Sequence, residues 1–275
     1  MLAQSGPLAR MPGVNDTFIE RADSELAGWT DPVRRLRDAI ENDEFELYCQ
    51  PILQFAGNER YPMGEVLVRL REEERALLPP GEFLPVFEHY RMMPQLDRWV
   101  VRNTVKRLAQ GSRIARFTVN LSGQALEDED FVRFVSAQLS VHQVAADKLL
   151  FEIDESDALL RLGACKRFGD AYRALGGQLL IDGFGNRAVS FMPVRELGVK
   201  FLKVDGTICR KVISSETARH KLATMVRVGQ TLGYSVVAEC VEDQDVLLRL
   251  KAMGVAYAQG FGIYQPHPMG ALAQV

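Results

Sequence analysis

The chain has 275 residues, with 33 Lys or Arg against 36 Asp or Glu, so its formal charge is −3 and it lacks the overall basic field with which proteins hold nucleic acid. A content of 47% hydrophobic and 25% charged residues is that of a globular protein and excludes a disordered chain. We find no run of about 18 apolar residues and no signal-peptide pattern at the start, which predicts a cytoplasmic protein with no membrane insertion.

The four cysteines are scattered along the sequence as Cys49, Cys165, Cys209 and Cys240. None of them forms a Cys-x-x-Cys pair, which argues against a zinc ribbon and against a disulfide framework. We therefore expect each to be a small buried side chain in a reducing compartment.

The start of the chain differs in composition from the rest. Residues 1–29 mix Gly, Pro, Ser and Asn with charges and show no sustained period, so we interpret them as a tail or tether. The tripeptide Thr30-Asp31-Pro32 then offers a helix cap and a first-turn proline, and apolar residues follow at helical spacing. We expect a single domain over residues 30–275.

Short β-rich runs alternate with amphipathic helical patterns through this domain. The runs cover residues 45–53, 63–70, 117–121, 149–153, 178–181, 201–204, 235–238 and 256–261. Repeated βα units of this number in about 245 residues favour a (β/α)₈ barrel, with a doubly wound open sheet as the alternative. The connection over residues 54–61 is too short for a crossover helix, which favours antiparallel pairing of the first two runs and hence a modified barrel.

Polar side chains stand at or near the ends of these apolar runs. They are Glu65, Asn120, Glu152, Asp182, Lys203, Asp205, Glu239, Glu242 and Gln259. The carboxyl ends of barrel strands meet on one face, so this pattern predicts a carboxylate-rich cup there. Several buried carboxylates need cations or a lysine beside them.

The kind of donor indicates the kind of cation. Glu65, Asn120, Glu152 and Asp182 all offer oxygen, which suits Mg²⁺, Mn²⁺ or Ca²⁺ rather than zinc, and Lys203 adds a positive charge. Each residue also has a plainer interpretation. Glu65 alone would suit an outward-facing strand position, and Glu242 would suit the start of the next helix. The whole set at nearly every strand end favours a site.

In this order the residues resemble the EAL domain family of bacterial cyclic di-GMP signalling proteins, from about Asp31 to Pro268. The matching motifs are Glu65-Val66-Leu67-Val68-Arg69 for Glu-Ala-Leu and its arginine, Asn120-Leu121-Ser122, Phe151-Glu152-Ile153 with Glu155-Ser156 for Phe-Glu-Ile-Thr-Glu, Leu202-Lys203-Val204-Asp205, Ala238-Glu239-Cys240-Val241-Glu242 and Gln259-Gly260-Phe261. The resemblance implies a modified (β/α)₈ TIM-like barrel with one antiparallel strand.

The resemblance also implies an activity, because active members hydrolyse cyclic di-GMP to pGpG with Mg²⁺ or Mn²⁺ and are inhibited by Ca²⁺. It implies that Glu65, Asn120, Glu152 and Asp182 ligate metal and that Lys203, Asp205 and Glu239 surround the hydrolytic water. It also implies ligand contacts from Gln50, Leu67 and Arg69, with Glu242 and Gln259 in the same cup. Glu155 would brace the loop after the 178–181 strand. An arginine suits a phosphate because its fork donates two parallel hydrogen bonds.

Two departures from the family pattern bear on activity. The family's Asp-Asp-Phe-Gly is Asp182-Gly183-Phe184-Gly185 here, so the second aspartate, which helps to hold a second metal in active members, is missing. The following loop, usually Thr-Gly-Tyr-Ser-Ser, covers residues 186–190 as Asn-Arg-Ala-Val-Ser, which puts its coupling of the metal site to dimerisation in doubt. We expect hydrolysis to be lost or lower by several orders of magnitude.

Three functions follow from this comparison. We favour a receptor that binds cyclic di-GMP and relays its occupancy to a protein partner, with no metal required. The second is an active metal-dependent phosphodiesterase in which a water or another acid, such as Asp205, replaces the missing ligand. The third is a nucleotide-free protein-interaction domain that regulates motility. Members of the family commonly dimerise, so the resemblance is compatible with a homodimer, although the sequence does not decide the oligomeric state.

Overall fold

The computed structural model describes residue 29 and residues 31–72, 76–186 and 189–274. Apart from Trp29, the predicted tail over residues 1–29 lies outside the described residues, as do residues 187–188 of the altered loop. The boundary between tail and domain therefore stays a prediction.

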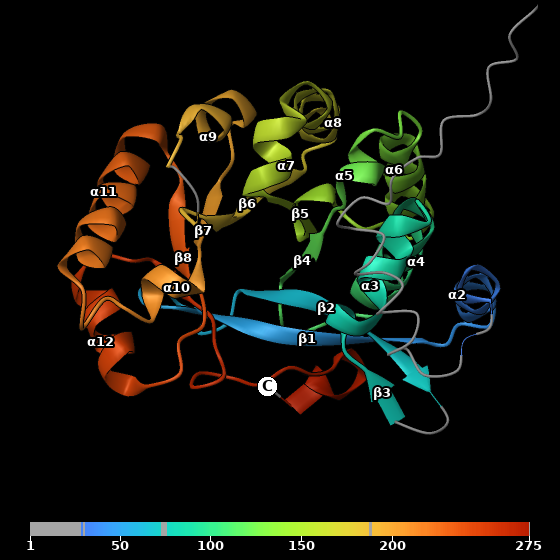
Figure 1. The fold of residues 1–275 in the computed structure, drawn as a ribbon, viewed down its shortest axis with the longest axis horizontal. Coiled ribbons are helices and arrows are strands. Elements are labelled where there is room, and N and C mark those ends of the chain that lie inside the picture. Colours follow the sequence, from blue (N-terminus) through green and yellow to red (C-terminus); the bar gives the residue numbers. More distant parts are fainter. Residues whose placement is uncertain (1–28, 30, 73–75, 187–188, 275) are drawn as a thin grey trace, which may run out of the picture.

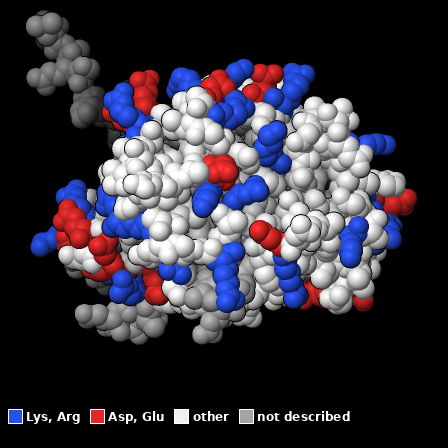
Figure 2. Space-filling view, turned by 180° about the vertical axis from the view of Figure 1, so that it is seen from behind, with Lys and Arg blue, Asp and Glu red and all other residues white. Residues whose placement is uncertain are grey.

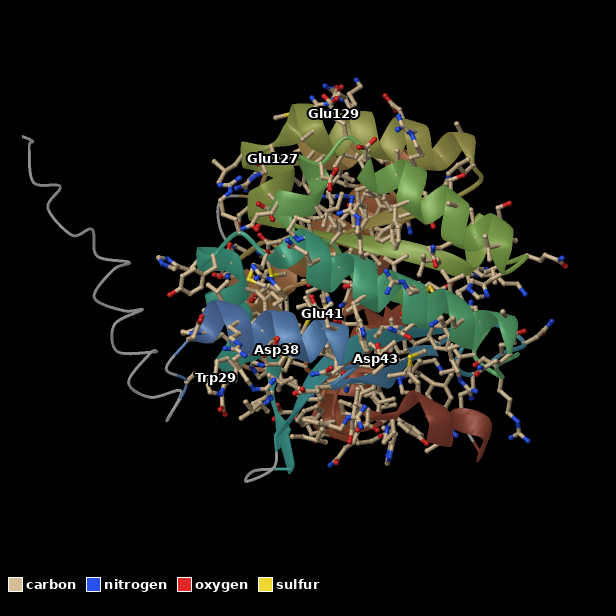
Figure 3. The ribbon with its side chains drawn as sticks, turned by 90° about the vertical axis from the view of Figure 1, so that its right-hand side faces the viewer. Trp29, Asp38, Glu41, Asp43, Glu127 and Glu129 are labelled. Carbon is tan, nitrogen blue, oxygen red and sulfur yellow. The ribbon has the colours of Figure 1, made fainter. Side chains whose placement is uncertain are left out.

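The first described helix, α2 (Pro32–Glu41), begins where the sequence predicts. The Asp31 side chain accepts a hydrogen bond from the Arg34 amide at 3.0 Å, which caps the helix. Figure 3 shows Trp29 beside this helix and Asp43 just beyond it. Asp43 ties the turn to the next layer, since its Oδ1 accepts a 2.6 Å hydrogen bond from the Trp99 indole.

Eight strands close into a barrel. They are β1 (Phe45–Gln54), β2 (Met63–Glu72), β4 (Arg116–Asn120), β5 (Leu149–Asp154), β6 (Gln178–Phe184), β7 (Phe201–Val204), β8 (Ser235–Ala238) and β9 (Tyr257–Ala258). β1 pairs antiparallel with both β2 and β9, and every other neighbouring pair in the ring is parallel. The modified barrel is confirmed, and the open sheet is excluded because β1 joins the two ends of the strand series.

Two further strands lie outside the predicted runs. β3 (Ala76–Leu78) extends the sheet beyond β2, and β10 (His267–Pro268) pairs with β1. The last predicted run, 256–261, is a paired strand only over the two residues of β9. Its remaining residues turn across the mouth of the barrel, where the backbone carbonyl of Gln259 accepts a hydrogen bond from the Val241 amide at 3.0 Å.

Helices cover the outside of the barrel, as Figure 1 shows for α4, α6, α8 and α11. Their bounds are α3 (Pro80–His89), α4 (Met93–Ala109), α5 (Gly123–Leu126), α6 (Phe131–Val141), α7 (Glu155–Leu160), α8 (Leu162–Ala174), α9 (Met192–Leu197), α10 (Gly206–Cys209), α11 (Glu216–Leu232) and α12 (Gln244–Ala252), with 3₁₀ turns η1 (Ala146–Lys148) and η2 (Met269–Gln274). This places one large apolar core between strands and helices.

A second, smaller core fills the inside of the barrel. It consists of Ile52, Met63, Leu150, Leu180, Phe201 and Val237, with Tyr257 packed against it. Side chains on one face of a strand recur every second residue, so the next inward position on each parallel strand lies two residues further on. Those positions are Glu65, Glu152, Asp182, Lys203, Glu239 and Gln259, and on the antiparallel β1 the equivalent is Gln50. An apolar floor therefore carries a polar layer.

The cysteine prediction is correct at three positions and wrong at one. Cys49, Cys165 and Cys209 are buried, whereas Cys240 is exposed. Cys240 follows the end of β8 at the mouth of the barrel and has a φ of 53°, so it belongs to the loop that lines the cup. The residues that follow the strand ends face the opening of the barrel, which is why Cys240 is exposed to solvent although the sequence predicts a buried side chain.

The surface agrees with the absence of a basic field. Figure 2 shows Lys and Arg interspersed with Asp and Glu, with wide uncharged areas between them, on the face turned away from Figure 1. Within the described part of the chain, no helix combines the length and the apolar character needed to cross a membrane.

Gly260 offers a test of how the barrel mouth is packed. A Cβ at this position would lie 2.1 Å from the carbonyl oxygen and 2.2 Å from the nitrogen of Val241, both of which are backbone atoms. We expect Gly260→Ala to lower the free energy of unfolding by about 1–3 kcal/mol or more in urea denaturation. Gly270→Ala is the matched control, because nothing lies within 4 Å of its added Cβ. Equal stability of the two variants would contradict this packing.

Candidate functional site

Lys203 is the centre of the polar layer inside the barrel. It lies on β7, two residues beyond the inner-core Phe201, and its side chain is fully buried. An ammonium group in such a place needs partners, because an unpaired buried charge is very costly.

Four carboxylates surround this ammonium, three from strands β2, β5 and β6 and one, Glu239, directly after β8. Lys203 Nζ lies 2.9 Å from Glu65 Oε2, 2.8 Å from Glu152 Oε2, 3.0 Å from Glu239 Oε1 and 3.5 Å from Asp182 Oδ1. The structure therefore brings together residues that lie up to 174 positions apart in the sequence, from Glu65 to Glu239. We name these five residues the lysine cluster.

Amide side chains extend the lysine cluster to the rim. Glu65 accepts hydrogen bonds from Asn120 Nδ2 at 2.9 Å and from Gln259 Nε2 at 2.7 Å. Gln259 Nε2 also donates to Gln50 Oε1 at 3.0 Å, and Gln50 in turn donates to the Tyr264 carbonyl at 2.9 Å. Glu65 is therefore fixed from three sides, and the predicted Gln50, Asn120 and Gln259 all lie in one network with it.

The lysine cluster carries more negative than positive charge. Burial raises the pKa of Glu152 well above its usual range, with Glu65 adding to the effect, and burial also raises the pKa of Asp182. Burial raises the pKa of Glu239 to about 7 against the opposing pull of Lys203. For Glu65, burial acts upward but Lys203 and three hydrogen bonds outweigh it, so its pKa is lowered.

The carboxylates stabilise the charged form of Lys203. Burial alone would lower the pKa of its ammonium, but Asp182, Glu152, Glu239 and Glu65 together raise it well above its usual range. One ammonium faces four carboxylates, so ionisation of all of them leaves three negative charges in excess. Such a site favours the uptake of protons or of cations.

The donor chemistry of the cup fits a divalent cation of the Mg²⁺ or Mn²⁺ type. Its acids and amide offer only oxygen ligands, and Glu152 Oε1 is buried with no hydrogen-bond partner among the described residues. Lys203 draws the carboxylates toward itself, and no group of three or more His, Cys, Asp or Glu among the described residues is arranged around an ion as it stands. Cation binding therefore requires some of these carboxylates to turn from the lysine.

Arg69 and Leu67 continue the inward-facing series of β2 above Glu65. β2 extends beyond the end of β4, whose last residue Asn120 marks the rim, so both side chains stand at the mouth of the cup. The Arg69 guanidinium donates to the Val68 carbonyl at 2.9 Å and lies over the Tyr48 ring, 5.5 Å from its centroid. Burial lowers the pKa of Arg69.

A cavity of about 150 Å³ opens beside the lysine cluster. It is lined by Gln50, Glu65, Glu239, Cys240, Glu242, Gln259, Gly260 and Phe261. Glu242 is exposed and bonds to none of the lysine cluster, so it belongs to the rim. Phe261 is 64% exposed, which presents an aromatic face at the cavity edge.

Asp205 and Glu155 have structural contacts outside the lysine cluster. Asp205 Oδ1 caps α10 by accepting from the Thr207 amide at 2.8 Å. Glu155 Oε2 accepts from the Gly185 amide at 3.2 Å, which joins the end of β5 to the loop after β6 as the family resemblance implies. Asp205 therefore lies outside the lysine cluster, with its Oδ1 engaged in the cap of α10.

Sequence reasoning missed two residues that shape this end of the barrel. Asp97 on α4 is buried, and its Oδ2 accepts from the Ser122 hydroxyl at 2.5 Å and from the Ser122 amide at 3.2 Å, which fixes the loop after Asn120. Burial raises the pKa of Asp97 to about 7. The sequence signal that could have revealed Asp97 is its position as an acid among the apolar residues of the helical pattern. Asp154, at the end of β5, is the second.

Replacing the central ammonium tests the lysine cluster. Lys203→Met keeps the bulk but leaves the carboxylates unpaired, and we expect it to lower the free energy of unfolding by about 3–5 kcal/mol near pH 8. A carboxyl whose pKa is raised on folding loses its stabilising contribution as pH rises through that pKa. Since the pKa of Glu239 is about 7, the defect should shrink near pH 5.5, where protonation removes charge.

The control for this variant is the exposed lysine of η1, Lys148, changed to methionine. Urea denaturation of both variants at the two pH values separates a buried charge from a general loss of lysine. A Lys203→Met protein as stable as the control at both values would contradict the cluster.

Comparison with known proteins identifies the family. The model of the EAL domain family matches residues 33–266. The chain is 29% identical over 273 residues to cyclic di-GMP phosphodiesterase PdeB of Shewanella oneidensis, covering 97% of this chain and 32% of that protein. It is 30% identical over 240 residues to cyclic di-GMP phosphodiesterase PdeF of Escherichia coli, covering 86% of this chain and 32% of that protein. The chain thus spans about a third of these relatives.

Solved structures share the fold. The EAL domain of FimX from Pseudomonas aeruginosa bound to c-di-GMP has a TM-score of 0.81 at 27% identity, covering 87% of this chain and 97% of that one. The PaMucR phosphodiesterase in its c-di-GMP complex also has a TM-score of 0.81, at 26% identity, covering 88% of this chain and 99% of that one. With a family model that matches most of its length and a barrel mouth built from the family's motifs, this chain belongs to the EAL domain family.

Proposed function

We propose that this domain is a cyclic di-GMP receptor, in which the cup binds the dinucleotide, hydrolysis is lost or strongly reduced, and occupancy is relayed to a protein partner. The observation that carries the reduced hydrolysis is Gly183, which has no side chain to hold a second cation beside Asp182. Binding is supported by the similarity to two structures that contain c-di-GMP, the FimX EAL domain and the PaMucR phosphodiesterase.

The chemistry of the cup suits a nucleotide with phosphodiester groups. Arg69 supplies a fork that donates two parallel hydrogen bonds to a phosphate, and Gln50 and Gln259 supply amides within the same opening. The exposed Phe261 ring offers a surface for a base. The carboxylates of the lysine cluster repel phosphate unless cations or protons neutralise them, so ligand binding is coupled to the charge state of the cluster.

Metal-dependent phosphodiesterase activity is the second candidate. It is supported by the similarity to the cyclic di-GMP phosphodiesterases PdeB and PdeF and by the presence of the lysine cluster. Glu65, Asn120, Glu152 and Asp182 would hold Mg²⁺ or Mn²⁺. When bound, such a cation polarises phosphoryl oxygens and lowers the pKa of a water.

In either candidate the protein's own groups have defined tasks. Lys203 holds Glu65 and Glu152 in place, and Gln259 with Asn120 orients Glu65. Glu239, with its pKa about 7, is the acid best matched to accept a proton near neutral pH. For a receptor of a bacterial messenger we also propose a cytoplasmic location and a homodimer, in keeping with the family.

Calorimetric titration with cyclic di-GMP, in EDTA and again in Mg²⁺ or Mn²⁺, distinguishes the candidates when the samples are also analysed for pGpG by chromatography. Binding without product is the expected result. Product formation would favour the phosphodiesterase, and the absence of both binding and product would overturn the proposal and favour a domain kept for protein contacts alone.

Arg69 is the residue whose loss should affect the ligand most directly. Arg69→Ala removes a charge-assisted phosphate contact, and we expect a loss of about 1.5–3 kcal/mol, or roughly 10- to 150-fold in affinity for cyclic di-GMP. Arg71→Ala is the control on the same strand, since the Arg71 guanidinium instead donates to the Asp43 carbonyl at 2.8 Å. Equal affinities of the wild type and Arg69→Ala would exclude this role.

A further inference from the structure

A carboxylate lies where the side chain of residue 183 would be. An ideal Cβ built on Gly183 lies 3.5 Å from Asp154 Oδ2, and no other atom outside its chain neighbours is within 4 Å. Asp154 is the last residue of β5 and stands in register with Asp182 on β6. Gly183 thus leaves open the space toward which Asp154, on the neighbouring strand β5, points.

The two oxygens of Asp154 have different surroundings. Oδ1 accepts a hydrogen bond from the Ser156 amide at 2.7 Å and so caps α7, whereas Oδ2 is the atom that faces Gly183. One oxygen therefore fixes the side chain while the other is presented to the barrel mouth. This orientation is set by the helix cap and does not depend on any bound group.

A second, independent observation is an unpartnered carboxylate oxygen on the same strand as Asp154. Glu152, two residues earlier on the same face of β5, is 1% exposed, and its Oε1 has no hydrogen-bond partner among the described residues. Its other oxygen is bound to Lys203 at 2.8 Å. A buried carboxylate oxygen left without a donor is costly, and a cation in the cup would satisfy it.

The sequence shows a matching exchange of residues. The family stretch Phe-Glu-Ile-Thr-Glu has threonine where this chain has Asp154, and the family's Asp-Asp-Phe-Gly has aspartate where this chain has Gly183. One acid is gained and one is lost at positions whose atoms are neighbours in space. Compared with the family pattern that this chain resembles, the number of carboxylates at this corner of the mouth is the same although their strands differ.

We infer that Asp154 replaces the missing aspartate, so that Asp154 and Asp182 together supply the carboxylates for a Mg²⁺ or Mn²⁺ ion at the mouth of the cup. Asp205, the other acid considered for this role, likewise caps a helix through its Oδ1, but no atom of Asp205 lies within 4 Å of a Cβ built on Gly183. The inference rests on the nucleotide site proposed above, and it changes one premise of that proposal. If Asp154 supplies the carboxylate that Gly183 lacks, reduced hydrolysis rests on the altered sequence of residues 186–190. Cation binding by itself is measured without nucleotide.

The test is a titration of the nucleotide-free full chain with Mn²⁺. Binding is measured by calorimetry and by the loss of the electron paramagnetic resonance signal of free Mn²⁺. Asp154→Asn removes the charge but keeps a good helix cap, so its thermal stability should match the wild type while Mn²⁺ affinity falls at least about tenfold. The control is Asp31→Asn, which makes the same change at the cap of α2.

A double-mutant cycle with Gly183→Asp sharpens the test. Residue 183 has a φ of +64°, which aspartate tolerates better than most residues, and the 3.5 Å spacing leaves room for its Cβ. In the Asp154→Asn background, Gly183→Asp should restore Mn²⁺ affinity. In the wild type it should add less, because two carboxylates would then compete for one space.

The outcomes separate this inference from the proposed function. Wild-type affinity for Mn²⁺ in Asp154→Asn, equal gains from Gly183→Asp in both backgrounds, or no Mn²⁺ binding by the wild type would each overturn the role of Asp154. A protein that binds Mn²⁺ through Asp154 but does not bind cyclic di-GMP would leave the inference intact and overturn the receptor proposal.

Discussion

The attraction between one buried ammonium and the carboxylates around it organises this domain. Lys203 is fully buried and reaches Glu65, Glu152 and Glu239 within 3.0 Å and Asp182 at 3.5 Å. Because those acids lie on or directly after four different strands, the ion pairs form only when the barrel is closed. The same groups that we propose to bind cations thus also stabilise the closed barrel.

The polar cup follows from the regular geometry of the strands on which it stands. The apolar floor of the barrel, which includes Leu150, Leu180 and Phe201, lies two residues before Glu152, Asp182 and Lys203 respectively. A period of two residues puts floor and cup on the same inner face, so hydrophobic packing below holds the charged layer above. The antiparallel β1 obeys the same rule in reverse, with Ile52 below Gln50.

The inferred cation site depends on which strand supplies each charge. Judged by its motif alone, Gly183 removes a ligand and reduces hydrolysis. In space, Asp154 Oδ2 lies 3.5 Å from where a Cβ of residue 183 would be, and a carboxylate therefore remains at that corner. A motif read along one strand and a site assembled from several can differ in this way, because cations respond to the donors around them and not to the order of those donors in the chain.

The sequence alone determined the alternation of strand runs and helices, the antiparallel start, and the polar residues at the strand ends, because periodicity and short connections are local properties. It did not reveal β3 or β10, whose short pairings depend on neighbours distant in the chain, nor the exposure of Cys240. Only the tertiary structure decided that Lys203 is the common partner of four acids, that Asp205 caps a helix, and that Asp154 faces Gly183. The physical reason is that electrostatic and hydrogen-bond partners are selected by distance in space, which closure of the barrel creates.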